Sequence, residues 1–242
     1  MNRTIMISDI HGCIDPFNQL LHDINYIPKN DELILLGDYV DRGPNSKEVV
    51  NKVIKLVNEH RAIALRGNHD QRLVDFVNEG SSIIKAKFIE HGGIQTLQSY
   101  CNIDGEISDE MLDQARERIK MDYGHHIDFL STLPLFHEDK THIYVHAGLN
   151  PDYIEWWKQP DHDFMYIKDK FIHHTFTNLQ KKIVFGHTTT IDIHGSADVW
   201  FGEDKIGIDG GCAYGMQLNG LIYQNGSYVT FDSKFNLSEV QR

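Results

Sequence analysis

Short runs of apolar residues recur along the chain, and a polar cluster that contains glycine follows each run. Short apolar runs bounded by glycine are typical of buried strands. After the first two runs, apolar residues return every three or four positions, as on the buried face of a helix. This alternation of strand, loop and helix predicts an α/β fold. The apolar runs are 4–8, 33–36, 62–65, 142–145 and 183–185, and the polar clusters after them are 9–12, 37–43, 66–70, 146–148 and 186–188.

Two helices are predicted in detail. Asp15 followed by Pro16 predicts a helix N-terminus, because aspartate caps free N–H groups and proline fits the first helical position. Ser46 is expected to cap the second helix. The apolar residues expected to face the core are Phe17, Leu20, Leu21 and Ile24 in the first helix, and Val49, Val50, Val53, Ile54 and Val57 in the second.

The pattern after about residue 205 predicts strands only. Strands are expected at 205–209, 218–224 and 228–231, and Asn225–Gly226 predicts a hairpin turn between the last two. The polar segment of residues 102–128 is expected to be a peripheral helical insertion. No repeat or Gly/Ser/Pro-rich linker interrupts the chain, so we expect one domain over residues 1–242.

Composition narrows the possible partners. The chain has 242 residues and a net charge of −12, which disfavours docking on a nucleic-acid duplex or an anionic membrane by charge alone. The apolar runs fall short of the roughly 18 residues that a membrane span needs. Three scattered cysteines, Cys13, Cys101 and Cys212, favour free thiols in a reducing, cytoplasmic setting. The oligomeric state stays open.

The polar clusters share aspartate, histidine and asparagine. Oxygen and imidazole ligands without thiolate suit Mn, Fe, Zn or Co. Each candidate alone is weak evidence, since a histidine in a tight turn usually has a structural role. Six candidates at five successive strand ends are too many for one tetrahedral ion, but they fit two ions that share a carboxylate. The candidate ligands are Asp9, His11, Asp38, Asn68, His146 and His187. Histidines in other polar contexts, such as His126, are expected to be solvated.

The clusters together resemble the signatures of the calcineurin-like metallophosphoesterases, phosphoprotein-phosphatase branch. The resemblance spans about residues 5–215 and includes the compact bacterial and phage protein phosphatases and symmetrical diadenosine tetraphosphatases. It implies a layered β-sandwich of two mixed sheets flanked by helices, with a dinuclear metal site at the carboxyl ends of strands. The matching segments are 8–12 (SDIHG), 37–43 (GDYVDRG), 65–70 (LRGNHD), 146–148 (HAG), 186–188 (GHT) and 208–212 (IDGGC).

The resemblance also implies roles for the six candidate ligands and their neighbours. Asp38 would bridge the two ions, and the resemblance implies a metal-bridging hydroxide that attacks phosphorus. His69 would be the general acid, oriented by Asp41, while Arg42 and Asn68 would contact the substrate phosphate. Manganese is the expected metal, with iron, zinc or cobalt as alternatives. An imidazole whose tautomer is fixed by a carboxylate, and an arginine that binds phosphate in bidentate fashion, suit these tasks.

Three positions depart from the family pattern. Ser8 replaces a glycine, and Asp70 replaces a glutamate, which is expected to alter contacts around the ligands rather than the ligands themselves. Lys168 lies where the family has a second phosphate-binding arginine, in the segment 165–171 (MYIKDKF). Lysine is a point charge, so phosphate orientation is expected to weaken. The alternative is that Lys168 is only solvated.

These features leave three functional hypotheses. The first is a serine/threonine protein phosphatase, which the acidic surface mildly favours. The second is the same chemistry on diadenosine tetraphosphate, for which Trp156, Trp157, Tyr166 and Tyr214 are candidate walls around the base. The third is a catalytically inactive scaffold, which the presence of all ligands disfavours.

Overall fold

Two five-stranded mixed sheets form the centre of the molecule. The computed structural model describes residues 3–103 and 108–234. The first sheet has the order β10-β9-β1-β2-β3, and the second has the order β4-β5-β6-β8-β7. In the first sheet β1, β2 and β3 are parallel; in the second β5, β6 and β8 are parallel. The strands are β1 Arg3–Ile7, β2 Asp31–Leu35, β3 Ile63–Ala64, β4 Phe136–Glu138, β5 His142–Val145, β6 Lys182–Phe185, β7 Trp200–Phe201, β8 Lys205–Gly207, β9 Gln217–Gln224 and β10 Ser227–Lys234.

Alternation along the strands divides the core into layers. Ile5 and Ile7 of β1 pack toward the helices, whereas Met6 between them faces the other sheet. In β6, Val184 shares the intersheet layer with Met6, and Ile183 packs on the opposite face. Successive strand residues point to opposite faces, so continuous apolar runs are what strands covered on both sides require. The predicted sandwich of two mixed sheets between helices is confirmed.

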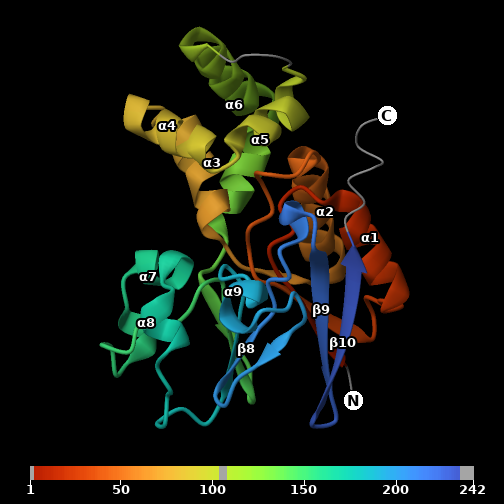
Figure 1. Ribbon diagram of the computed structural model, residues 1–242. Coiled ribbons are helices and arrows are strands. Elements are labelled where there is room, and N and C mark those ends of the chain that lie inside the picture. The colour runs from red at the N-terminus through yellow and green to blue at the C-terminus, as the bar shows by residue number, and fades with distance from the viewer. Residues whose placement is uncertain (1–2, 104–107, 235–242) are drawn as a thin grey trace.

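Helices cover both outer faces of the sandwich (Figure 1). Helices α1 and α2 pack on the first sheet, and α7 and α8 lie on the side of the second sheet (Figure 1). In the described part of the chain, no helix combines the length and apolar character needed to cross a bilayer. The helices are α1 Ile14–Asp23, α2 Ser46–His60, α3 Asn68–Asn78, α4 Ser82–Glu90, α5 Gly93–Cys101, α6 Asp109–Thr132, α7 Asp161–Tyr166, α8 Asp169–Ile172 and α9 Thr190–His194.

The start of each predicted helix differs from the expectation. Asp15 lies inside the first turn of α1, and the flanking residue is Cys13. Proline is tolerated in that turn because its missing N–H has no partner there in any case. Ser46 is the first residue of α2 rather than its cap, which is Asn45. The Ser46 hydroxyl instead accepts a hydrogen bond from the backbone N–H of Asp41, at 3.2 Å, and so supports a loop at the site.

Most of the segment 102–128 is helical, within α6; residues 104–107 lie outside the described residues. Helix α6 lies at the far end of the molecule from the strand hairpin (Figure 1). Its apolar side belongs to the main core through Leu112, Ala115 and Ile119, so the helix is more than a surface addition. The chain bends at Tyr123, whose backbone leaves helical geometry. The predicted Asn225–Gly226 turn joins β9 to β10, as expected.

Candidate metal centre

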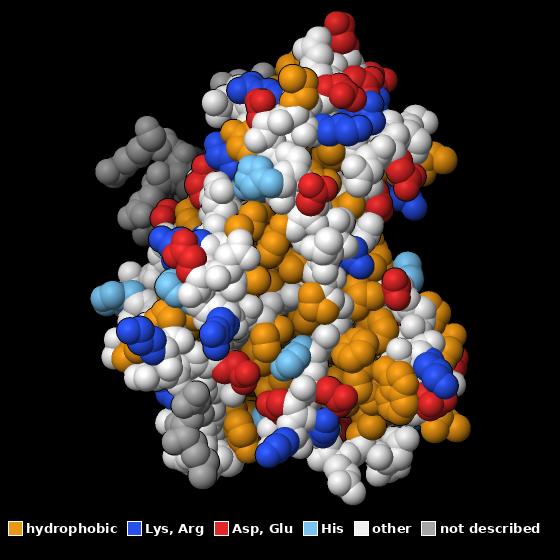
Figure 2. Space-filling view, turned by 180° about the vertical axis from the view of Figure 1, so that it is seen from behind, with side chains coloured by type: hydrophobic (Ala, Val, Ile, Leu, Met, Phe, Trp, Pro, Cys, Tyr) orange, Lys and Arg blue, Asp and Glu red, His pale blue; other side chains and the backbone are white. Residues whose placement is uncertain are grey.

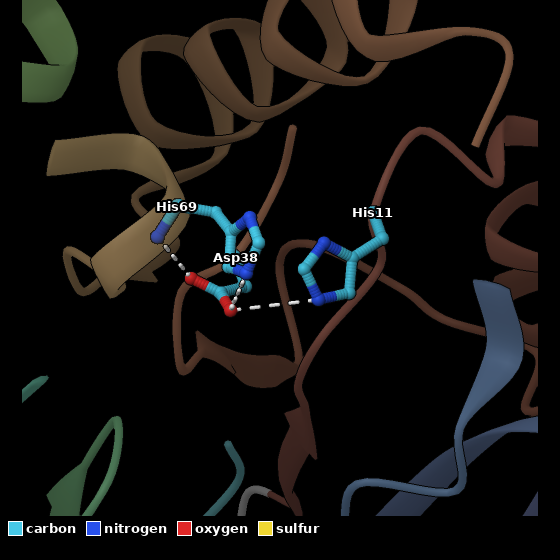
Figure 3. Close-up of side chains that lie close together, drawn as sticks. All are labelled: His11, Asp38 and His69. Carbon is cyan, nitrogen blue, oxygen red and sulfur yellow. Dashed lines mark hydrogen bonds and ion pairs between the residues drawn. The ribbon is translucent and has the colours of Figure 1, made fainter. Parts of the chain in front are cut away.

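One group of candidate ligands lies in the loops after β1 and β2. The Nε2 atom of His11 is 3.4 Å from Oδ2 of Asp38 and 3.9 Å from Oδ1 of Asp9. His69, at the start of α3, turns its own Nε2 toward the same Asp38 oxygen at 4.0 Å (Figure 3). All four side chains are buried. Strands β1 and β2 are parallel neighbours, so their carboxyl ends bring Asp9, His11 and Asp38 together.

A second group uses loops from both sheets. His146 follows β5 and His187 follows β6, and with Asp38 they form a cluster whose ligand atoms lie within 4.8 Å of one another. Nε2 of His146 is 3.5 Å from Oδ1 of Asp38. One terminal atom of the Asn68 amide lies 3.0 Å from that Nε2 and 2.9 Å from Nδ1 of His187. Asp38 is therefore common to both groups, one carboxylate oxygen facing each.

The donor set fits divalent cations. Nδ1 of His11 is 2.7 Å from the Val40 carbonyl and Nδ1 of His146 is 2.9 Å from the Leu36 carbonyl, so each Nδ1 carries the proton and donates it. Each Nε2 then carries a lone pair and lies within 3.5 Å of a carboxylate oxygen of Asp38. Burial, reinforced by nearby Arg42, lowers the pKa of His11 to about 3, which keeps this imidazole neutral. Convergent lone pairs and carboxylates in a buried site are what a bound cation needs.

The carboxylate shared by the two groups stays ionised. Burial by itself raises the pKa of Asp38, but the imidazoles of His146, His69 and His11 outweigh burial and hold the pKa below its usual range. The backbone N–H of His69 also donates to Oδ1 of Asp38 at 2.9 Å. Nε2 of His187 is buried and has no hydrogen-bond partner among the described residues. Asp38 is thus placed and charged as a bridging ligand would be.

His69 is held between a carboxylate and a guanidinium. Its Nδ1 is 2.8 Å from Oδ2 of Asp41, and the hydroxyl of Thr96 donates to Oδ1 of Asp41 at 2.6 Å. Arg42 spans two imidazoles, with Nη1 2.6 Å from Nε2 of His11 and Nη2 2.8 Å from Nε2 of His69. Asp41 fixes the tautomer of His69, so that Nε2 carries the lone pair and faces both Arg42 and the carboxylate of Asp38.

Backbone strain gathers at these residues. Ten non-glycine residues among those described have positive φ, and six of them belong to the site. The left-handed region costs roughly 1–2 kcal/mol for a residue with a Cβ, so the fold must hold these loops in place by other contacts. Backbone hydrogen bonds from Asp9 to Gly37 and from His11 to Asp38 are two such contacts. The six are Asp9, His11, Asp38, Asp41, Arg42 and His187.

Comparison with known proteins agrees with this geometry. The model of the calcineurin-like phosphoesterase family matches residues 3–208. The chain belongs to this family. A bis(5'-nucleosyl)-tetraphosphatase PrpE, described as asymmetrical, from Anoxybacillus flavithermus is 27% identical to this phosphoesterase, over 94% of the chain and 93% of the relative.

Two further comparisons cover the substrate classes already considered. A symmetrical bis(5'-nucleosyl)-tetraphosphatase from Nitrosococcus oceani is 35% identical over 61% of the chain, but the match spans only 44% of that relative. A protein serine/threonine phosphatase from Saccharomyces cerevisiae shares the fold with a TM-score of 0.58 and 15% identity, over 97% of this chain and 80% of that one. The predicted family is confirmed, whereas the predicted preference for phosphoproteins is not specifically supported, because the likeness to this phosphatase shows the fold alone.

A hollow of about 330 Å³ opens beside the candidate metal ligands of the phosphoesterase. Lys168, which is predicted to take the place of a second phosphate-binding arginine, lines this hollow together with Asp38, Arg42 and His187. The guanidinium of Arg42 also lies 5.0 Å from the ring centroid of Tyr214, a half-exposed tyrosine in the same hollow. The hollow beside the candidate ligands is therefore lined by two cations, Arg42 and Lys168, and by the aromatic ring of Tyr214.

The other candidate aromatic residues lie in different surroundings. Trp156 is buried in the core of the second sheet and Trp157 is about half exposed, and neither lines the hollow beside Arg42. Tyr166 lies near His187, with ring centroids 6.4 Å apart. Arg66, a neighbour of the ligand loop, donates to the carbonyl of Ser131 at 2.8 Å and braces α6.

Three residues at the site had no role assigned to them from the sequence. Asp209 is buried in the hollow beside Arg42, and burial raises its pKa well above the usual range. It belongs to the 208–212 motif, which was a usable signal. Thr96 binds Asp41, as described above. Arg72 places its guanidinium 2.7 Å from the Asn68 amide and 5.4 Å from the Tyr166 centroid. Nothing in the sequence around Arg72 marks it.

Proposed function

We propose that this phosphoesterase is a dinuclear metal-dependent hydrolase whose substrate is a dinucleoside polyphosphate such as diadenosine tetraphosphate. The observation that carries the proposal is the setting of Arg42. Its guanidinium contacts the imidazoles of His11 and His69 and also lies against the Tyr214 ring, with Lys168 lining the same hollow. A phosphate beside the ligands thus has two cations and a ring next to it, which suits a nucleotide. The end-to-end match to a named tetraphosphatase supports the same class.

The proposed ligands are Asp9, His11 and Asp38 for one ion, and Asp38, Asn68, His146 and His187 for the other. Two bound divalent ions would acidify the attacking water and neutralise charge on the phosphoryl oxygens. Manganese is the proposed metal, since oxygen and imidazole donors accept it and cellular availability decides among the alternatives.

Phosphate binding and proton transfer are assigned to side chains around the proposed ions. Arg42 donates two N–H groups to the phosphoryl oxygens, and Lys168 contributes a further positive charge. His69 gives the proton on Nε2 to the leaving oxygen as the P–O bond breaks, and Asp41 holds Nδ1. Burial lowers the pKa of His69 well below its usual value, and a bound phosphate dianion opposes this effect by favouring the protonated ring.

Hydrolysis of phosphoserine or phosphothreonine in proteins is the second candidate, because the fold is shared with a serine/threonine phosphatase. A paired assay separates the two. The protein is stripped of metal and reloaded with Mn²⁺, and kcat/KM is measured on diadenosine tetraphosphate and on a phosphothreonyl peptide. Preference for the dinucleotide is expected. Preference for the peptide would refute the proposal in favour of the second candidate, and inactivity on both with metal bound would favour a scaffold.

A further inference from the structure

A second hollow adjoins the metal centre and shares no lining residue with the one beside Arg42. Its volume is about 390 Å³, and it lies between α3 and α4 on one side and α7 on the other (Figure 1). The lining residues are Arg72, Asp75, Ile83, Ile84, Lys87, His91, His162 and Tyr166. From behind, apolar side chains gather across the middle of the molecule, between the helical part above and the sheets below (Figure 2).

Three contacts connect this hollow to two candidate ligands and to His69. The Arg72 guanidinium is 2.7 Å from the Asn68 amide. The ring of His91 is 6.3 Å from that of His69, and the ring of Tyr166 is 6.4 Å from that of His187, between centroids. The second hollow therefore lies one layer of side chains away from the candidate ligands.

The second hollow has cations that the fold leaves unpaired. Arg72 is half-buried, and within the described ranges 3–103 and 108–234 no carboxylate forms an ion pair with it. Lys87 is exposed at the rim and likewise lacks an acidic partner in those ranges, whereas nearby Asp75 accepts a hydrogen bond from Gln71. A half-buried guanidinium without a carboxylate is suited to an anionic ligand. This local surplus of positive charge occurs in a chain of net charge −12.

The same hollow has flat rings and an apolar wall. His162 and Tyr166 are stacked, with centroids 4.4 Å apart and planes inclined by 12°. Ile83 and Ile84 of α4 supply the apolar wall, and Ile83 is 68% exposed. Bases bind proteins by stacking on such rings while arginine and lysine contact the phosphates.

We propose that this Arg72 subsite, formed by Arg72, Lys87, His162 and Tyr166, binds the nucleoside phosphate half of the substrate that the hollow beside Arg42 does not hold. The inference rests on the proposed function and extends it. A phosphate monoester of a small alcohol has no second half, whereas a dinucleoside polyphosphate has a nucleoside on both sides of the reacting phosphorus and further phosphates on at least one side.

The test compares two substrates in the Mn²⁺-loaded protein. Diadenosine tetraphosphate needs both hollows, and p-nitrophenyl phosphate needs only the metal centre. Tyr166→Leu and Arg72→Gln are each expected to lower the ratio of kcat/KM for the dinucleotide to that for the small ester about tenfold, and Lys87→Gln several-fold. Metal content is measured for each variant, because Arg72 lies against Asn68.

The matched control is Lys85→Gln. Lys85 lies on the same helix as Lys87 but pairs with Asp113 at 2.6 Å and lines neither hollow, so both activities are expected to stay as in the wild type. Binding of a methylene-bridged dinucleoside tetraphosphate, measured by calorimetry, provides a readout apart from turnover. Its Kd is expected to rise in the three subsite variants by the same factors.

The outcomes separate this inference from the proposed function. If the wild type hydrolyses the dinucleotide and neither the ratio nor the Kd changes in the subsite variants, the Arg72 subsite is refuted and the proposed function stands. If the wild type hydrolyses p-nitrophenyl phosphate but not the dinucleotide, the proposed function is refuted, and the subsite with it.

Discussion

The carboxylate of Asp70 holds the two ligand loops together, and its removal has effects that can be counted. Asp70 is fully buried. Its Oδ2 accepts hydrogen bonds from the backbone N–H groups of Asp38 and Gly67, and its Oδ1 accepts one from Tyr39, all at 2.9 Å. These bonds join the loop after β2 to the start of α3. They agree with the prediction that Asp70 acts on the surroundings of the ligands rather than as one of them.

The expected loss in the free energy of unfolding follows from the number of N–H donors that lose their partner. Asp70→Ala leaves three buried N–H groups without a partner, and each costs about 1–3 kcal/mol. We expect a loss of about 3–6 kcal/mol in the free energy of unfolding, because water entering the vacated space recovers part of the cost. Asp70→Asn keeps one oxygen for the Asp38 and Gly67 donors and turns its amide toward Tyr39. That variant loses one bond and about 1–3 kcal/mol.

Urea unfolding of the metal-free protein measures both variants, with the slope checked against the wild type. Asp75→Ala is the control: Asp75 lies five residues further along the same helix, is only half-buried, and accepts a side-chain hydrogen bond from Gln71. Its loss should stay within about 0.5 kcal/mol, as is usual for substitutions near the surface. Equal losses for Asp70→Ala and Asp70→Asn, or a loss below about 1 kcal/mol for both, would refute the count of donors.

Three further predictions concern the site and the rim of the first sheet. His69→Asn should keep its metal content and lose about 10²–10⁴-fold in kcat on a phosphoseryl ester. The loss on an anhydride should be smaller, because a phosphate leaving group needs less help from an acid than an alkoxide does. Full activity on both substrates would exclude His69 as the general acid. Asp38→Asn should reduce occupancy at both metal positions, as measured by elemental analysis; unchanged stoichiometry would contradict a bridging role. Burial tends to raise the pKa of Asp31, but hydrogen bonds from Arg3 and the Ile27 N–H prevail and lower it. The stability that this carboxylate adds is therefore present above its ordinary pKa of about 4 and is lost as pH falls through the lower folded value. The difference in urea midpoint between wild type and Asp31→Asn should shrink from pH 6 to pH 3, and a constant difference would show that the ion pair adds nothing.

Much of the fold could be predicted because its signals are local. An apolar run followed by glycine is contained in a few residues, so the strands and the loops with Asp9, Asp38 and Asn68 could be located. The details of helix starts could not, since Ser46 has a partner in a neighbouring loop rather than in its own helix.

Long-range contacts explain the larger errors. His126 was expected in solvent, yet it is buried and forms hydrogen bonds with Tyr100 and Asn51, from two other helices. Arg72 contacts Tyr166 only when α3 and α7 come together in the folded chain. No pattern within either segment encodes such meetings, because they depend on how distant elements pack.

The division of the candidate ligands between the two sheets has a consequence for the order of folding. Asp9, His11 and Asp38 all follow strands of the first sheet, so that sheet alone can assemble one proposed position. The other position adds His146 and His187 from the second sheet and exists only after the sheets have docked. An ion bound there would link the two sheets, and its binding affinity would include the free energy with which the sheets dock. Loading of the second position would thus report when the two halves of the chain have come together.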